Sequence, residues 1–113
     1  MNINKQKILQ ALQKHYDKAV ALSLDLSDHP ELPYEEFESS KKIVKILSEA
    51  GFKVTYPYAG YHTAFCAELD NGTGPSAALL VEYDALPEIG HGCGHNLLGT
   101  ACAGAACELK ERM

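Results

Sequence analysis

The sequence predicts an α/β fold. Three observations predict it: two early segments have the apolar spacing of amphipathic helices, short runs rich in β-branched and aromatic residues follow, and a helix of small residues comes last. Helical and strand patterns that alternate in this way favour an α/β domain over an all-helical one. At 113 residues the chain has room for a single domain over residues 1–113.

Two helices are expected first. Apolar residues at steps of three or four predict a helix over roughly residues 4–27, with a stripe of Ile8, Leu12, Tyr16, Ala19, Leu22 and Leu26. Two prolines end this pattern, and acidic residues then open a second helix, because negative charge complements the dipole at a helix N-terminus. Gly51 is expected to end the second helix, whose predicted buried stripe is Phe37, Ser40, Val44, Leu47 and Ala50.

Three strands are expected next. Residues 53–58 are rich in β-branched and aromatic side chains and predict one strand, residues 63–69 are expected to form a second, and residues 70–75 form a turn or short hairpin connection. Residues 76–83 are a continuous apolar run of strand length, which is typical of a strand covered on both faces. Ligands of α/β folds gather at the carboxyl ends of such strands, so we expect a site just after residue 83.

A last helix is expected from Asn96, its predicted cap, to about Arg112. Its middle, residues 101–107, carries only small side chains, which predicts close packing against a neighbouring element. The cysteines outside the central loop are expected to be free and structural, as buried thiols are in reducing compartments: Cys66, Cys102 and Cys107.

The charge pattern argues against some classes of function. The formal net charge is −5, and no Lys or Arg occurs between residues 54 and 109. Nucleic-acid binding needs the opposite balance, so we expect no nucleic-acid partner. No apolar run approaches the roughly 20 residues that span a bilayer, and the polar start resembles no signal peptide, so a cytoplasmic protein without a membrane partner is expected. The acidic stretch suits a bound cation, although a solvated acidic surface gives the same count.

The most informative segment is residues 90–95, Gly-His-Gly-Cys-Gly-His. Glycine serves where the backbone takes unusual dihedral angles or approaches a neighbour closely. Histidine and cysteine are the donors that zinc prefers. In an extended stretch residues two apart point the same way, so His91, Cys93 and His95 are predicted to face one point.

Two carboxylates precede this loop. Glu82 and Asp84 are two apart at the predicted strand end and so leave it on the same face, where a nearby cation would stabilise them. Other interpretations stay open: Asp84 as a capping residue, Cys93 as a small residue in a tight turn, and His95 as a helix cap. His91 could instead be a loop histidine that does not contact a metal, and Glu82 could be an ordinary hydrogen-bonded carboxylate at a strand end. The isolated histidines are expected to be structural: His15, His29 and His62.

These residues carry a resemblance. Residues 81–96, Val-Glu-Tyr-Asp-Ala-Leu-Pro-Glu-Ile-Gly-His-Gly-Cys-Gly-His-Asn, resemble the metal-site signature of the aminoacylase and carboxypeptidase family of metallopeptidases. They are most similar to the amidohydrolase branch, with its auxin-conjugate hydrolases, aminobenzoyl-glutamate hydrolases and dipeptidases. Residues 28–36 also resemble that family's early segment, with Pro33 in place of a common glycine.

The resemblance implies a fold and site residues. The fold would be the N-terminal part of an α/β/α zinc-exopeptidase-like catalytic domain, truncated. Cys93 and His95 match the metal ligands of this branch, and Asp84 matches an aspartate that orients a ligand or assists catalysis. Glu82 occupies the position of a metal-binding histidine in other branches, and Asn96 favours the dipeptidase-like and aminobenzoyl-glutamate-like members. The implied cofactor is a divalent metal, zinc first, with manganese and cobalt as alternatives.

The resemblance also implies a function. The expected activity is hydrolysis of the amide bond in a small peptide or N-acyl amino acid. The family's glutamate base and later ligands lie beyond the helix that ends near Arg112, so the chain alone is expected to be inactive. We expect either a missing C-terminal portion or a homo-oligomer, as the family's inserted domain often makes a dimer. The alternatives are a non-catalytic metal-binding protein, a split-enzyme subunit and a truncated reading frame.

Overall fold

The computed structural model describes residues 4–113. This part of the chain contains four α-helices, a two-stranded sheet and one short 3-10 helix: α1 (Lys5–Gln13), α2 (Tyr16–Asp28), α3 (Phe37–Glu49), β1 (Lys53–Thr55), β2 (Cys66–Glu68), η1 (His91–Cys93) and α4 (His95–Arg112). The predicted α/β class is therefore confirmed.

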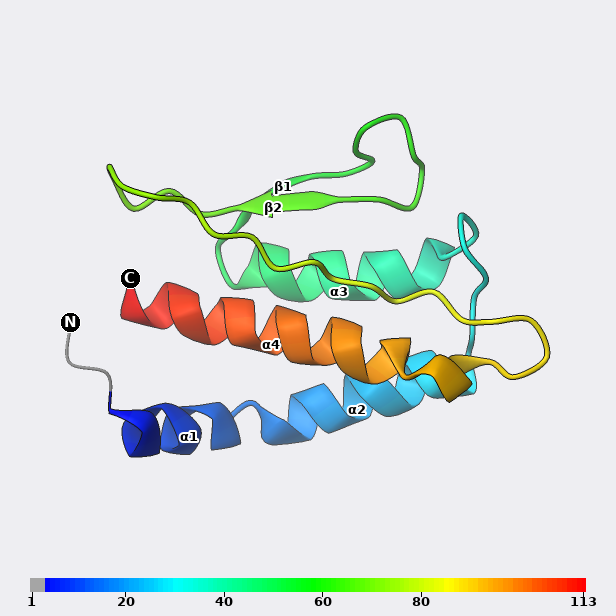
Figure 1. Ribbon diagram of the computed structural model, residues 1–113, viewed down its shortest axis with the longest axis horizontal. Helices are drawn as coiled ribbons and strands as arrows, with labels where there is room; N and C mark the ends of the chain where they lie inside the picture. Colours follow the sequence, from blue (N-terminus) through cyan, green and yellow to red (C-terminus); the bar gives the residue numbers. More distant parts are fainter. Residues whose placement is uncertain (1–3) are drawn as a thin grey trace.

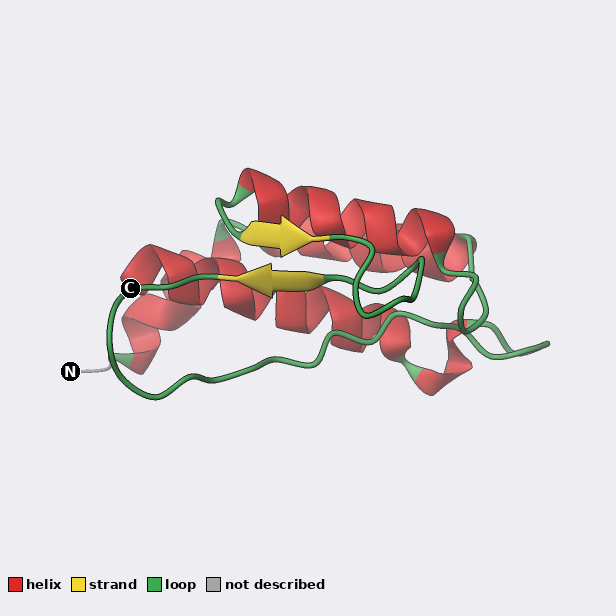
Figure 2. Cartoon of the chain, turned by 90° about the horizontal axis from the view of Figure 1, so that it is seen from above, coloured by secondary structure: helices red, strands yellow, loops and turns green. Residues whose placement is uncertain are grey.

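The last helix lies between the earlier ones. α4 packs against α1, α2 and α3, and α3 packs in turn against β1 and β2. Figure 1 shows α4 between α2 and α3, with the sheet on the far side of α3. Figure 2, seen from above, shows the two strands running over the helical layer. The strands are antiparallel, with Val54 opposite Ala67.

The single long helix predicted over residues 4–27 is wrong. The chain breaks at Lys14 and His15 into α1 and α2. Leu22 and Leu26 of the predicted stripe are buried, but α1 buries no side chain and Tyr16 is 65% exposed. The predicted apolar stripe is therefore buried only in α2, where Leu22 and Leu26 pack into the core. The break leaves His15 facing α4.

The second helix agrees with its prediction in extent and differs in its buried face. α3 ends just before Gly51, whose φ of +100° is a conformation that glycine adopts without strain. Leu47 is buried as expected, but Phe37 is 49% exposed, and Ile43 fills the core in its place. Ser39 and Ser40 are also buried. The Ser40 hydroxyl is satisfied by the Phe37 carbonyl and the Tyr56 hydroxyl.

The buried strand predicted over residues 76–83 is wrong. In the described part of the chain β1 and β2 pair only with each other, and no ladder includes this segment. Residues 76–80 are exposed, and Leu80 is 78% exposed. An apolar run becomes a strand only beside a partner strand that takes up its backbone hydrogen bonds. The run crosses the molecule as an extended segment between β2 and the loop before α4 (Figure 2).

The close packing predicted for the small-residue helix is confirmed. Ala103 is 1% exposed and joins the core of Leu22, Leu26, Ile43, Leu47 and Tyr83. Gly99 brings α4 against the segment before Asp84, because a Cβ at Gly99 would lie 2.6 Å from the Glu82 carbonyl oxygen. No helix within residues 4–113 combines the length and the apolar character needed to cross a membrane.

Candidate functional site

The segment that carries the acidic residues is held from both sides. The Ala85 N–H donates to the Glu31 carbonyl at 2.7 Å. The Tyr83 hydroxyl donates to the Thr63 carbonyl, and its ring stacks on Phe65 with centroids 6.0 Å apart. Burial, with the nearby charge of Glu36, raises the pKa of Tyr83 well above its usual range, so this hydroxyl remains a donor. Asp84 thus lies between two anchored neighbours.

The loop before α4 is a turn, so the extended conformation predicted for residues 90–95 is wrong. Leu86 and Gly90 exchange two backbone hydrogen bonds of 2.9 and 3.0 Å, and residues 91–93 form η1. Gly90 and Gly94 have φ values of +57° and +86°, which confirms the expected need for glycine at these two positions. Because the backbone curls, His91 and Cys93 are not placed on one face by strand alternation.

The structure brings both acidic residues to one histidine. His95 Nδ1 lies 2.8 Å from Asp84 Oδ1, and His95 Nε2 lies 3.0 Å from Glu82 Oε2. The side chains of Asp84 and His95 are each 26% exposed, while that of Glu82 is 50% exposed. Glu82 and Asp84, predicted to leave a strand end on the same face, lie outside any strand in the described structure, and both contact His95. Glu82, whose role the sequence left open, contacts the site directly.

Cys93 lies beside this trio. Its Sγ is 3.9 Å from the Asp84 carbonyl oxygen, which also lies 3.1 Å from His95 Nδ1. Cys93 is exposed, so the interpretation as a small buried residue in a tight turn is wrong. All four cysteines are free thiols, as expected, and burial raises the pKa of the Cys107 thiol.

His91 has buried ring nitrogens that lack partners. Neither Nδ1 nor Nε2 has a hydrogen-bond partner among the described residues. Burial, together with the charge of His95, lowers the pKa of His91, which favours a neutral imidazole with one free lone pair. A buried polar atom without a partner is costly, and a metal ion is one group that would use it. The thiol of Cys93 and the carboxylate of Glu82 are donors that divalent metals accept, so the chemistry of the donor set fits such a cofactor, but in the described residues these atoms do not all lie within 4.8 Å of one another.

Asn96 does not cap α4, contrary to the prediction. Gly94 holds the cap position, and the Asn96 amide donates to the carbonyl and hydroxyl of Ser23 at 3.2 and 3.1 Å. This pair ties the first turn of α4 to α2. Asn96 therefore stabilises the helix that carries His95.

A cavity of about 370 Å³ opens beside Asp84. Tyr34 and Tyr61 line it with their rings 5.8 Å apart, and Glu36, Thr63 and Tyr83 contribute to its wall. It is widely open to solvent, and its volume falls within the range of small-molecule sites. No sequence pattern pointed to the tyrosine pair, because 27 positions separate the two residues.

Two features escaped the sequence prediction. Glu31 supports the site through its carbonyl, a backbone contact that no side-chain pattern reveals. His15, expected to stand alone, lies beside Glu108 and Glu111. Within residues 4–113, His15, Glu108 and Glu111 are the one group of three or more His, Cys, Asp or Glu side chains whose possible metal-ligand atoms all lie within 4.8 Å of one another. Cys93 and His95 belong to no such group.

Comparisons with known proteins give several relatives. The chain is 43% identical over 101 residues to a p-aminobenzoyl-glutamate hydrolase subunit of Escherichia coli, covering 74% of this chain and 21% of that protein. It is 33% identical over 122 residues to the Xaa-Arg dipeptidase of Mus musculus, covering 100% and 28%. It is 33% identical over 117 residues to N-acetyl-L-cysteine deacetylase of Bacillus subtilis, covering 91% and 27%.

These alignments leave most of each relative uncovered. The chain spans about a fifth to just over a quarter of the length of these proteins. No protein-family model matches the chain.

Proposed function

The chain belongs to the amidohydrolase and peptidase family of these relatives, and on that premise we propose that it forms part of an enzyme that hydrolyses an amide bond. The proposed substrates are dipeptides and N-acyl amino acids, because the relatives' names refer to aminobenzoyl-glutamate, Xaa-Arg dipeptides and acetylcysteine. The activity belongs to a longer polypeptide or assembly, since the chain spans only part of each relative.

We assign Cys93 and His95 as ligands of a divalent metal, with zinc first and manganese or cobalt as alternatives. The observation that carries this assignment is the 2.8 Å contact between His95 Nδ1 and Asp84 Oδ1. A carboxylate that accepts the Nδ1–H of a histidine fixes the tautomer and presents Nε2 to a metal. In the structure the Glu82 carboxylate lies 3.0 Å from that Nε2. It would move aside when the metal binds there, and it could then ligate the metal itself.

The metal would supply a Lewis acid that polarises the amide carbonyl and lowers the pKa of a bound water. The other contributions come from this chain's own residues. Asp84 orients His95 and holds its Nδ1 proton. The cavity beside Asp84, with Tyr34 and Tyr61 on its wall, would hold part of the substrate.

The chain alone is proposed to be inactive. General-base catalysis contributes about 10²–10⁴-fold to the rate, and both acidic residues of the site are engaged with His95. An assay of the purified chain with zinc, manganese or cobalt against p-aminobenzoyl-glutamate, an Xaa-Arg dipeptide and N-acetyl-cysteine should give no turnover above background. Metal-dependent turnover that Cys93→Ser abolishes would contradict this part of the proposal.

Metal titration tests the ligand assignment. Cys93→Ser and His95→Ala should each lower zinc affinity at least about tenfold, because each removes a direct donor. Cobalt bound to the original chain should show a thiolate charge-transfer band that Cys93→Ser removes. Cys66→Ser is the matched control, since Cys66 lies in β2 away from the loop. Equal affinity in all four proteins would overturn the assignment.

A second candidate is a split-enzyme component that binds metal without turnover of its own. The exposed apolar residues of the segment 76–80 favour it, because another polypeptide would cover them. Mixing the chain with a second polypeptide, corresponding to the remaining length of the Escherichia coli relative, tests this candidate. Activity that arises only in the mixture supports the split enzyme, and a mixture without complex formation argues against it.

A further inference from the structure

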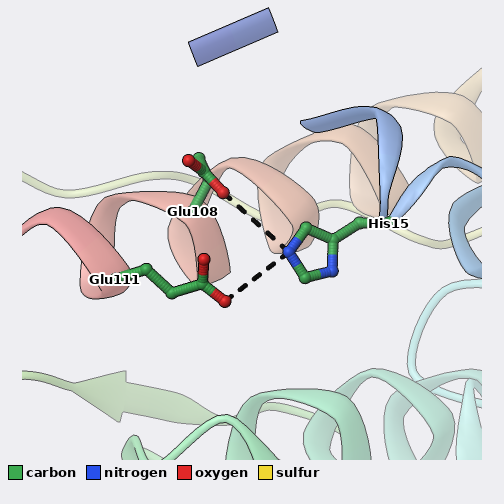
Figure 3. A group of neighbouring side chains, drawn as sticks. All are labelled: His15, Glu108 and Glu111. Carbon is green, nitrogen blue, oxygen red and sulfur yellow. Dashed lines mark ion pairs between the residues drawn. The ribbon is translucent and has the colours of Figure 1, made fainter. Parts of the chain in front are cut away.

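A second group of side chains that could ligate a metal lies at the opposite end of α4 from the loop of residues 90–95. His15, at the break between α1 and α2, faces Glu108 and Glu111 in the last turns of α4 (Figure 3). His15 Nε2 is 3.6 Å from Glu111 Oε1 and 3.9 Å from Glu108 Oε2. Both separations exceed a hydrogen bond.

Each carboxylate uses one oxygen for a cation and turns the other toward the imidazole. Glu111 Oε2 accepts from Lys14 Nζ at 2.8 Å, and Glu108 Oε1 accepts from Arg112 at 2.9 Å. The hydrogen bond from Lys14 lowers the pKa of the Glu111 carboxyl, so this group stays ionised. The remaining oxygens, Glu111 Oε1 and Glu108 Oε2, point at His15 Nε2.

Two of these donor atoms are buried without a hydrogen-bond partner in the described structure. They are His15 Nε2 and Glu108 Oε2, and the side chain of Glu108 is only 5% exposed. A buried carboxylate oxygen without a hydrogen bond is costly. The ion pair with His15 across 3.9 Å offsets this cost only when the imidazole is protonated, and a bound metal ion is a second group that would offset it.

The spacing fits a metal ion as that group. Two donor atoms each about 2.1 Å from a tetrahedral zinc ion lie about 3.4 Å apart. The two separations from His15 Nε2, 3.6 and 3.9 Å, exceed this value by a few tenths of an ångström, and all three donor atoms lie within 4.8 Å of one another, so side-chain rotations that draw them inward would complete the site. One imidazole nitrogen and two carboxylate oxygens are a donor set that zinc accepts, with water as the fourth ligand.

We propose that His15, Glu108 and Glu111 form a structural site for zinc or a similar divalent transition metal. The site is separate from the one proposed at Cys93 and His95. Its ion would join the break between α1 and α2 to the C-terminal turns of α4. Since α1 buries no side chain, the ion would add to the Lys14–Glu111 ion pair as a second link between this region and α4.

The test uses the 113-residue chain carrying Cys93→Ser and His95→Ala, so that the site at the loop cannot contribute. Zinc titration of this protein should show one remaining site, and zinc should raise the thermal unfolding midpoint by more than about 4 °C. Adding Glu111→Gln or His15→Ala should lower the zinc affinity at least about tenfold. Cobalt bound here should show no thiolate charge-transfer band, because the donors are nitrogen and oxygen.

Matched controls separate ligation from folding. His62→Ala and Glu68→Gln change residues of the same types that are exposed and make no side-chain hydrogen bond or ion pair in the described structure, and both should leave the affinity unchanged. Glu111 is 43% exposed, so Glu111→Gln should keep the helical circular dichroism of the parent. Absence of a remaining zinc site, or equal affinity in the Glu111→Gln and Glu68→Gln proteins, would overturn the proposal. Failure of the Cys93 and His95 assignment would leave these results unchanged.

Discussion

Glu31 supports two parts of the molecule at once. Its carboxylate accepts the backbone N–H groups of Glu38 and Ser39 at 3.1 and 2.6 Å, in the first turn of α3. Its carbonyl accepts the Ala85 N–H, next to Asp84. Burial by itself raises the pKa of the Glu31 carboxyl, but the hydrogen bonds from Ser39 and Glu38 outweigh it and hold the pKa below its ordinary value.

Glu31→Gln should therefore lower stability in a pH-dependent way. Because the folded pKa lies below the unfolded value, the ionised carboxylate stabilises the fold above the unfolded pKa, and this contribution is lost as pH falls through the folded pKa. We expect a loss of about 1 kcal/mol near pH 7, the usual size of a helix cap. The difference should shrink below about pH 4.

Urea unfolding at a series of pH values measures this effect. Glu35→Gln is the control, because Glu35 lies in the same loop and its side chain makes no hydrogen bond or ion pair in the described structure. A loss for Glu31→Gln that is the same at pH 3 and pH 7 would contradict the assigned role of the charge.

Asp84 acts on the proposed metal through His95. Asp84→Asn removes the charge 2.8 Å from His95 Nδ1 and permits the wrong tautomer. We expect zinc affinity at the Cys93 and His95 site to fall about 10–100-fold while the fold is kept. Zinc titration with Asp70→Asn as the control checks this, since Asp70 holds only the turn at Gly72. Equal affinities in the two variants would show that Asp84 does not orient the ligand.

At the scale of elements, α4 positions the site by lying very close to the segment before Asp84. Gly99 makes this approach possible, since its position faces the Glu82 carbonyl with no room for a Cβ. Gly104, in the same helix, faces open space. The helix therefore contains two glycines with opposite expected responses to alanine.

Gly99→Ala should destabilise the fold by about 1–3 kcal/mol, because the added Cβ would lie 2.6 Å from a backbone oxygen and force the helix outward. Gly104→Ala should stabilise it by about 0.5–1 kcal/mol through helix propensity alone. Urea unfolding of both variants measures the free energies of unfolding. Zinc affinity at the Cys93 and His95 site should fall in Gly99→Ala only, since Glu82 and His95 are then displaced. Equal stability of the two variants would contradict the close approach of α4.

At the scale of the whole molecule, the sheet consists of β1 and β2 alone within the described residues. The segment of residues 76–80 runs exposed and outside any ladder within the described chain, with Leu79 47% and Leu80 78% exposed. Exposed apolar segments next to a sheet promote association. We expect the isolated chain to form oligomers or aggregates in size-exclusion chromatography.

Replacing both leucines with lysine should shift the elution toward monomer, because charge at such a segment opposes pairing. Leu24→Lys is the control, since Leu24 is 58% exposed on α2, away from the sheet. A clean monomer of the original chain with a cooperative transition at high temperature would contradict the need for a covering partner.

Local patterns determined much of this molecule. The α/β class, the end of α3 just before Gly51 and the small-residue packing of α4 followed from spacing and backbone preferences. Each of these depends on residues close in sequence. The loop residues Cys93 and His95 stood out for the same reason, since their donor types and glycine neighbours are local features.

Tertiary structure decided the rest. Whether residues 76–83 become a strand depends on a neighbouring strand, and whether α1 buries its stripe depends on what lies against it. His15 meets Glu108 and Glu111 across more than 90 positions, and Glu31 reaches Ala85 through its backbone. Periodicity records which face of a segment is apolar. It does not record which other segment covers that face, because that contact is made only when distant parts of the chain pack together.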